Sequence, residues 1–271
     1  MILMTAVVSS PLFAARAAGT AIKIIDAHIH YSHDAWDRLP PAEAVAILRQ
    51  AGLSKAFISS SSDQGTQMLY KEAPDLVVPV LRPYRRRGEL DSWFRDTTVV
   101  AMLSALLDKN TYAGIGEFHI FGEDADLPVF RAVVTLAKKH QIFLHAHADA
   151  DAIERIFKQD PDARVLWAHS GFTDLKNIRG MLAKYPHLNA DLAFRTELAT
   201  SGILDADWKK LFLDFPDRFM LGTDTYTPER WFDVIENANW NREWLKDLPE
   251  NVARNIAFNN ADSLANWALK K

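Results

Sequence analysis

The chain has 271 residues, 48% of them hydrophobic and 24% charged, and its 31 Lys+Arg against 35 Asp+Glu give a formal net charge of −4 at pH 7. This charge argues against a nucleic-acid partner, because dedicated nucleic-acid binders usually present a basic face. No stretch approaches the ~18 apolar residues that a membrane-spanning helix needs, so no membrane partner is expected. The chain has no cysteine, which excludes disulfides, thiolate nucleophiles and thiolate zinc sites. Any metal must be held by His, Asp and Glu.

The first 20 residues differ from the rest. Residues 2–15 are mostly apolar and small, and Ala15-Arg16-Ala17 has the small-x-small form of a signal-peptidase site. We therefore expect residues 1–20 to be a signal peptide cleaved near Ala17, and the protein to be exported to the periplasm. A poorly ordered N-terminal segment on a cytoplasmic protein is the alternative. Residues 21–271 then form the folded domain.

Eight short apolar runs follow, separated by longer helical patterns. The runs cover residues 22–27, 56–59, 76–81, 112–118, 142–147, 165–169, 188–192 and 219–224. Such runs suit parallel strands that are covered on both faces. Eight β/α repeats in about 250 residues favour a single-domain α/β fold, the (β/α)8 TIM barrel, over an open doubly wound sheet. No Gly-rich dinucleotide fingerprint follows the first run, which also weakens the open sheet.

The helical patterns have readable ends. The first begins at Pro40-Pro41 and ends before Gly52, which stands where a C-cap belongs. Another starts near Asp126 with Pro128 in its first turn. The remaining patterns cover residues 98–107, 152–157, 175–184 and 228–237.

Ionisable residues close five of the eight runs. The first run leads into His28 and His30, and this i, i+2 spacing puts both imidazoles on one side of a strand. The fourth, fifth, sixth and eighth runs end in Glu117, in His145 and His147, in His169, and in Asp224. The C-terminal strand ends are where such barrels place their chemistry. Imidazoles and carboxylates together are a ligand set for zinc, manganese, iron or nickel.

The motifs at these ends are DAHIH, GIGEF, FLHAHAD, WAHSG and LGTD, in chain order. In this order they resemble the amidohydrolase superfamily of metal-dependent enzymes. The resemblance is closest to the branch with small-ring lactonases and carboxylate-processing decarboxylases, and more distant to the TatD-like nucleases. The C-terminal ARNIAFNNADSLANW resembles the closing helix of that branch, so the match runs from Ile24 to about Trp267.

The resemblance implies a role for each strand-end residue. His28 and His30 bind the more buried metal, and Asp224 completes its ligand shell and accepts a proton from the attacking water. His145 is the fifth-strand ligand, and His169 the sixth-strand His, which binds metal or handles protons. A helix N-cap is the structural alternative for Asp224.

Three further residues have alternatives that the sequence leaves open. His147 shares strand parity with His145 and could replace it; otherwise it points to the substrate, as His119 could. Glu117 either bridges two cations, as in the binuclear hydrolases that the motifs resemble, or orients an imidazole through its ring N–H. The cofactor is therefore one or two divalent ions per chain, zinc first, with manganese, iron or nickel as alternatives.

Two arginines follow the third and seventh runs. Arg195 and Arg82 stand at the catalytic ends of their strands, where a guanidinium could anchor a substrate carboxylate. The alternative for Arg195 is a salt bridge to Glu197 or Glu229.

The expected function is a metal-dependent hydrolase that uses a metal-activated water on a small ester, lactone or amide, with a carboxylate on the substrate as an option. The main alternative is a non-oxidative decarboxylase or hydratase on a mononuclear site. A TatD-like nuclease and a non-catalytic metal- or solute-binding barrel rank lower. The expected partner is a small molecule, and the oligomeric state is open, with a homo-oligomer included.

Export is testable directly. If residues 1–17 are removed, the mature protein from the native host begins near Ala18 because signal peptidase cuts after the small-x-small site. Intact-mass measurement checks this start. A full-length product in the cytoplasm would contradict the prediction.

Overall fold

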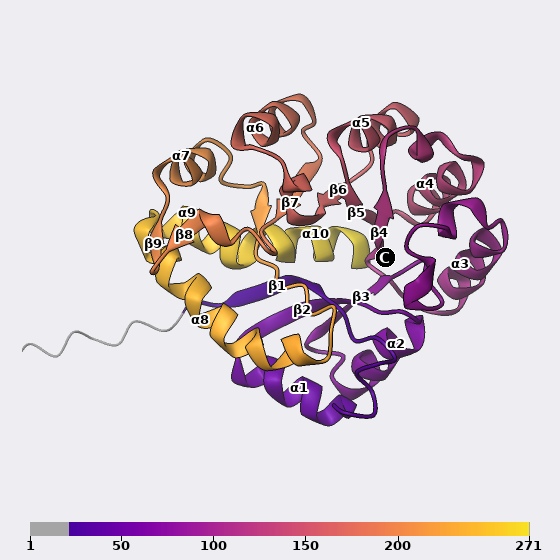
Figure 1. Cartoon of the computed structure of the whole chain (residues 1–271), viewed down its shortest axis with the longest axis horizontal. Coiled ribbons are helices and arrows are strands. Elements are labelled where there is room, and N and C mark those ends of the chain that lie inside the picture. The colour runs from indigo at the N-terminus through magenta and orange to yellow at the C-terminus, as the bar shows by residue number, and fades with distance from the viewer. Residues whose placement is uncertain (1–21, 271) are drawn as a thin grey trace, which may run out of the picture.

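The computed structural model describes residues 22–270, in which eight parallel strands alternate with helices (Figure 1). The strands are β1 (Ile24–Ile29), β2 (Leu53–Ser59), β3 (Val77–Leu81), β4 (Gly114–Ile120), β5 (Phe143–Ala148), β6 (Val165–Trp167), β7 (Leu188–Asp191) and β10 (Phe219–Met220). They follow one another around the sheet in chain order. Two backbone hydrogen bonds join the last strand region to the first: Ala27 N–H to Leu221 O (2.8 Å) and Asp224 N–H to His28 O (2.7 Å). The predicted TIM barrel is confirmed.

The helices surround the strands with their apolar faces inward. They are α1 (Pro41–Gln50), α2 (Asp63–Glu72), α3 (Thr98–Lys109), α4 (Pro128–His140), α5 (Ala150–Gln159), α6 (Leu175–Lys184), α7 (Ala206–Asp214), α8 (Val234–Trp244), α9 (Glu250–Arg254) and α10 (Asn260–Leu269). Asp149, Asp174 and Asp205 cap α5, α6 and α7 by accepting hydrogen bonds from backbone N–H groups of the first turn. Within residues 22–270 the structure has no helix long and apolar enough to cross a membrane.

Some elements differ from the predicted pattern. The predicted helix at 228–237 is a 3-10 turn (Glu229–Asp233) followed by α8. The helix α2 was not predicted because it is largely polar and buries only a few side chains. Neither α7 nor the hairpin of β8 (Ala199–Thr200) and β9 (Ile203–Leu204) was predicted; the hairpin strands have two residues each, too few to show a period.

Two strands end earlier than the apolar runs that predicted them. The structure ends β6 at Trp167 and β10 at Met220, whereas the predicted runs continued to His169 and Asp224. His169 has φ 56° and Asp224 has φ 50°, and this left-handed conformation cannot continue a strand. Both side chains therefore lie in turns beyond the strand ends.

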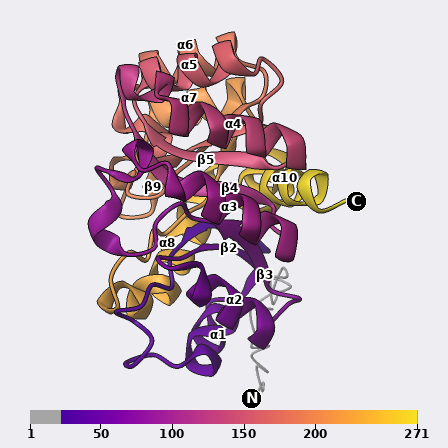
Figure 2. The same ribbon diagram turned by 90° about the vertical axis from the view of Figure 1, so that its right-hand side faces the viewer.

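The helix α10 covers the N-terminal end of the strands (Figure 2). Asn260 donates a hydrogen bond from Nδ2 to Phe219 O (2.9 Å), and Asp262 forms an ion pair with Lys55 near the start of β2 (2.6 Å). Trp267 lies under the Arg164 guanidinium just before β6. This end is closed by packing, and the polar residues identified in the sequence lie at the other end. The predicted signal peptide at residues 1–20 lies outside the described residues and stays a prediction.

Candidate metal centre

Three imidazoles at the C-terminal end of the barrel have their Nδ1 atoms turned outward. His28, His30 and His169 each place Nδ1 against an oxygen that can only accept a hydrogen bond. Those oxygens are, in that order, Asp191 Oδ2 at 3.1 Å, Ser59 O at 2.6 Å and Ala193 O at 3.0 Å. Each Nδ1 therefore carries a proton, and each ring in its neutral form has an Nε2 lone pair directed inward.

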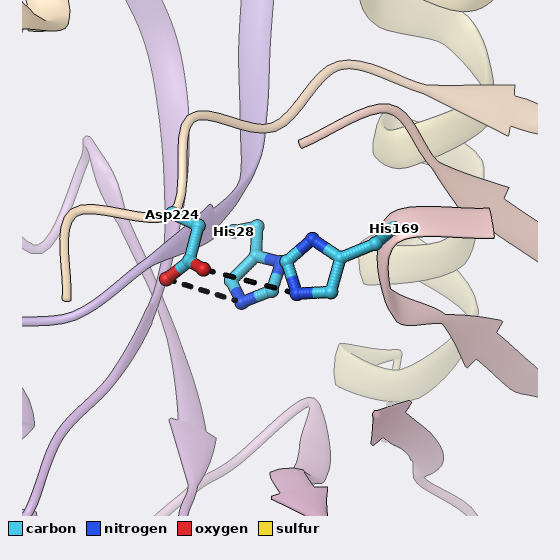
Figure 3. Close-up of side chains that lie close together, drawn as sticks. All are labelled: His28, His169 and Asp224. Atoms are coloured by element: carbon cyan, nitrogen blue, oxygen red, sulfur yellow. Dashed lines mark ion pairs between the residues drawn. The ribbon is translucent and has the colours of Figure 1, made fainter. Parts of the chain in front are cut away.

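The three Nε2 atoms converge with two carboxylates, and Figure 3 shows His28, His169 and Asp224 of this group. His28 Nε2 lies 3.2 Å from His30 Nε2. His30 Nε2 lies 3.2 Å from both Glu117 Oε2 and Asp224 Oδ1, and His169 Nε2 lies 3.5 Å from Glu117 Oε1 and 3.7 Å from Asp224 Oδ2. All five side chains are buried. These separations match those between ligands that surround one small cation at 2.0–2.2 Å.

Two observations test whether a cation fits this group. His28 Nε2 and His30 Nε2 lie 3.2 Å apart, and this contact is repulsive unless a positive charge, a metal cation or a proton on His28, lies between them. In addition, the buried Asp224 Oδ1 has no hydrogen-bond partner within residues 22–270. Buried oxygens without a partner are rare and costly. The donor set therefore fits a divalent metal.

The charge of the centre supports the same conclusion. Without a cation in the centre a proton takes its place, because Asp191, Asp224 and Glu117 outweigh burial and hold the pKa of His28 well above its usual range. The charge on His28 and the hydrogen bond from His147 in turn outweigh the burial of Glu117 and hold its pKa well below its usual range. Burial is outweighed in the same way at Asp224, where His28 and His30 lower the pKa to about 2. Among the described residues, the permanent cation in contact with these carboxylates is Arg82, whose Nη2 lies 2.7 Å from Glu117 Oε2. The buried carboxylates are balanced when a divalent cation binds.

Asp191, at the end of β7, contacts the groups around the centre, and the sequence analysis did not single it out. Its Oδ2 accepts hydrogen bonds from His28 Nδ1 and from His145 Nε2 (3.0 Å). Its Oδ1 accepts from the backbone N–H groups of His169 (2.9 Å) and Ala193 (3.0 Å). Burial would raise the pKa of Asp191, but His28 and His145 together hold it below its usual range. Asp191 ends β7 but lies inside the apolar run 188–192 that predicted this strand, so the strand-end signal did not identify it.

The two histidines of β5 hydrogen-bond different carboxylates. His145 donates to Asp191, behind the converging nitrogens, whereas His147 places Nδ1 2.9 Å from Glu117 Oε1. His119 stacks on His147 with 4.1 Å between the ring centroids, and its Nδ1 pairs with the Tyr84 hydroxyl at 2.9 Å. Burial lowers the pKa of His119 to about 3, so its imidazole is neutral at pH 7.

The two arginines predicted to anchor a substrate carboxylate are occupied by protein groups. Arg82 donates from Nε and Nη2 to the backbone and side-chain oxygens of Glu117. Arg195 donates from Nε to Glu197 Oε1 (2.6 Å), which is the salt-bridge alternative. Its Nη1 and Nη2 donate to the carbonyls of His169 (3.2 Å) and Thr173 (3.0 Å). All three Arg195 nitrogens have acceptors in the chain, so its guanidinium positions the His169 turn.

The fold is similar to that of several solved structures. No protein-family model matches the chain, and no curated protein is similar to it. An uncharacterised TIM-barrel protein from Bordetella bronchiseptica is 16% identical, with 91% of this chain and 99% of that chain covered and a TM-score of 0.67. A putative 2-pyrone-4,6-dicarboxylic acid hydrolase from Pseudomonas putida is 13% identical, with 91% and 98% covered and a TM-score of 0.60. An amidohydrolase from Burkholderia multivorans is 14% identical, with 89% and 98% covered and a TM-score of 0.52.

These neighbours share the TIM-barrel fold that the sequence predicted, and one of them is described as an amidohydrolase. At such low identities the likeness establishes the fold, and the ligand geometry described above is a property of this chain itself.

The Asp191 contacts generate a prediction about metal affinity. We expect Asp191→Asn to bind zinc about 10- to 100-fold more weakly, because the amide cannot accept from His28 and His145 while holding both backbone N–H groups. Calorimetric zinc titration of the purified protein measures this. Asp174→Asn makes the same chemical change at an exposed N-cap of α6 and should leave affinity unaltered. Equal affinity of the wild type and Asp191→Asn would contradict the role assigned to Asp191.

Proposed function

We propose that this protein is a metal-dependent hydrolase of the amidohydrolase type that cleaves a small ester, lactone or amide. The observation that carries the proposal is the convergence of three Nε2 lone pairs on two buried carboxylates, one of which has an unpartnered oxygen. The similar solved structures described as an amidohydrolase and as a putative 2-pyrone-4,6-dicarboxylic acid hydrolase support the same reaction class.

The residues that would hold the metal are His28, His30, Asp224, Glu117 and His169. Zinc suits this set best, with manganese, iron and nickel as alternatives. A divalent cation held there would lower the pKa of a water molecule and polarise the carbonyl oxygen of the substrate.

Asp224 is the residue best placed to take the proton of the attacking water. Its pKa of about 2 keeps it ionised at neutral pH, and its Oδ1 is unpartnered. Its turn is held from two sides. Arg230 donates from Nε to Asp224 O (2.7 Å) and from Nη2 to Thr223 O (2.9 Å). Asp26 accepts hydrogen bonds from the Thr223 hydroxyl (2.7 Å) and backbone N–H (3.1 Å). The base is therefore fixed before substrate binds.

Glu117 is placed to serve two cations. Its Oε2 lies 3.2 Å from His30 Nε2, whereas its Oε1 lies 2.9 Å from His147 Nδ1, 3.5 Å from His169 Nε2 and 3.6 Å from His28 Nε2. A carboxylate whose two oxygens face different sets of imidazoles suits a bridging ligand. In this arrangement His147, and not the expected His145, would join these five residues as the fifth-strand ligand of a second cation, and His145 would support Asp191. The mononuclear decarboxylase or hydratase is the second candidate, because Arg82 already neutralises Glu117 through Oε2.

The first test of the function concerns His28 and His30. Replacing both with Ala removes two of the three converging Nε2 donors, so we expect metal content and hydrolysis to be lost together. Elemental analysis of protein purified without chelators, and turnover of a panel of small esters, lactones and amides, measure these two quantities. His33→Ala is the matched control, because this exposed histidine hydrogen-bonds the Ser61 carbonyl and packs on Trp36 at the rim. Retained metal with normal turnover in the double variant would contradict the proposed function.

The second test concerns the number of ions. A bridging Glu117 implies about two metals per chain in the wild type and one in Glu117→Gln, because the amide cannot donate negative charge to both. Elemental analysis against protein concentration counts them. About one metal in both proteins would contradict the bridge and favour the mononuclear decarboxylase or hydratase.

A further inference from the structure

Four aromatic side chains follow four strands at the end of the barrel that holds the metal centre. They are Phe121 after β4, Phe172 after β6, Phe194 after β7 and Tyr226 after β10, and we call them the aromatic collar. Three of them are unusually exposed for large rings: Phe121 by 48%, Phe172 by 55% and Tyr226 by 47%. Apolar surface grouped beside a polar site is typical of ligand binding.

The collar is built directly onto the imidazoles of the centre. The Phe172 ring stacks on His169 with a centroid distance of 4.4 Å and an interplanar angle of 15°. It also lies 5.7 Å from His147, and Phe121 lies 6.0 Å from the same imidazole. Phe194 lies 5.7 Å from His169. A group held between these rings would therefore lie next to any bond that reacts at the centre.

The backbone holds Phe172 at a conformational cost. Residues 169–172 all have positive φ, with values of 56°, 50°, 70° and 47°. Gly171 is required there, because a Cβ on it would lie 2.0 Å from a ring atom of Trp167. For the three other residues the left-handed conformation is unfavourable, and such strain concentrates at functional sites. This strained turn directs the His169 imidazole inward and places the half-exposed Phe172 ring beside it.

The opposite part of the collar is fixed by a cation. Phe194 and Tyr226 lie 5.9 Å apart, and the Arg230 guanidinium lies over both rings, at 4.2 Å and 5.5 Å from their centroids. Arg230 also holds the Asp224 turn through two backbone carbonyls. The rings on this side are therefore held in place before a ligand arrives, which lowers the cost of ordering them on binding.

We propose that the aromatic collar binds a flat, unsaturated ring of the substrate, so that the protein selects aryl carbonyl compounds over saturated ones of equal size. The inference rests on the proposed function, which places the reacting carbonyl at the metal centre. Ring faces and edges gain from offset and edge-to-face contacts with a flat ring, whereas a puckered aliphatic ring makes only apolar contact. Burial of apolar surface alone would favour the saturated ring, because its apolar surface is larger. The sign of the preference therefore distinguishes contact between aromatic rings from simple burial.

Benzoate and cyclohexanecarboxylate are matched probes, since both carry one carboxylate on a six-membered ring. We expect the metal-loaded full chain to bind benzoate roughly tenfold more tightly in calorimetric titration. Phe172→Leu should remove most of this preference while keeping a side chain of similar polarity. Phe232→Leu, at a ring that is 69% exposed on Glu229–Asp233 and outside the collar, should keep it. Equal affinity for the two acids, absence of binding by both, or a preference that survives Phe172→Leu would overturn the inference.

Turnover of the two methyl esters separates this inference from the proposed function. Hydrolysis of methyl benzoate and methyl cyclohexanecarboxylate with no ring preference would contradict the collar and leave the hydrolase standing. A benzoate preference in binding, lost in Phe172→Leu, with no hydrolysis of any carbonyl substrate, would support the collar and contradict the hydrolase.

Discussion

The buried carboxylate of Asp191 is the interaction on which the centre depends. Removing an ionised carboxylate from water costs several kcal/mol unless hydrogen bonds replace its hydration. Asp191 obtains four of them, from side chains on β1 and β5, from the turn after β6 and from the residues following its own strand. Charge-assisted hydrogen bonds of this kind are the strong ones. Because one residue collects them all, the positions of His28 and His169 are set together.

The imidazoles of His30 and His169 are also oriented by an acceptor at Nδ1, which in both cases is a backbone carbonyl. Backbone carbonyls of Ser59 and Ala193 receive the Nδ1 protons of His30 and His169, so every inward Nε2 is fixed as a lone-pair donor. Ser59 ends β2, and Ala193 lies two residues beyond the end of β7 with its own N–H bonded to Asp191, so the scaffold positions both carbonyls. The tautomers are thus determined by the scaffold, and the centre is organised before any ligand binds.

The two ends of the barrel divide stability and chemistry between them. At one end, α10 packs across the strand starts with a capping amide, an ion pair and a ring under a guanidinium. At the other end, strained turns hold His169, Phe172 and Asp224 in left-handed conformations that each cost about 1 kcal/mol or more. The well-packed end and the large buried core offset that cost. This division is the usual one in (β/α)8 barrels, where the C-terminal strand ends carry the reaction.

The sequence by itself determined the barrel and the residue types of the centre. Apolar runs, helix ends and ionisable residues at strand ends are local features, and strand polarity alone brings Glu117, His169 and Asp224 to one end. The tertiary structure decided which atoms face one another. It separated His145 from His147, engaged Arg195 with Glu197 and two carbonyls, and made Asp191 the partner of His28 across 163 positions of the chain. No local pattern encodes those choices, because each depends on how far a side chain from one strand reaches toward groups contributed by several others.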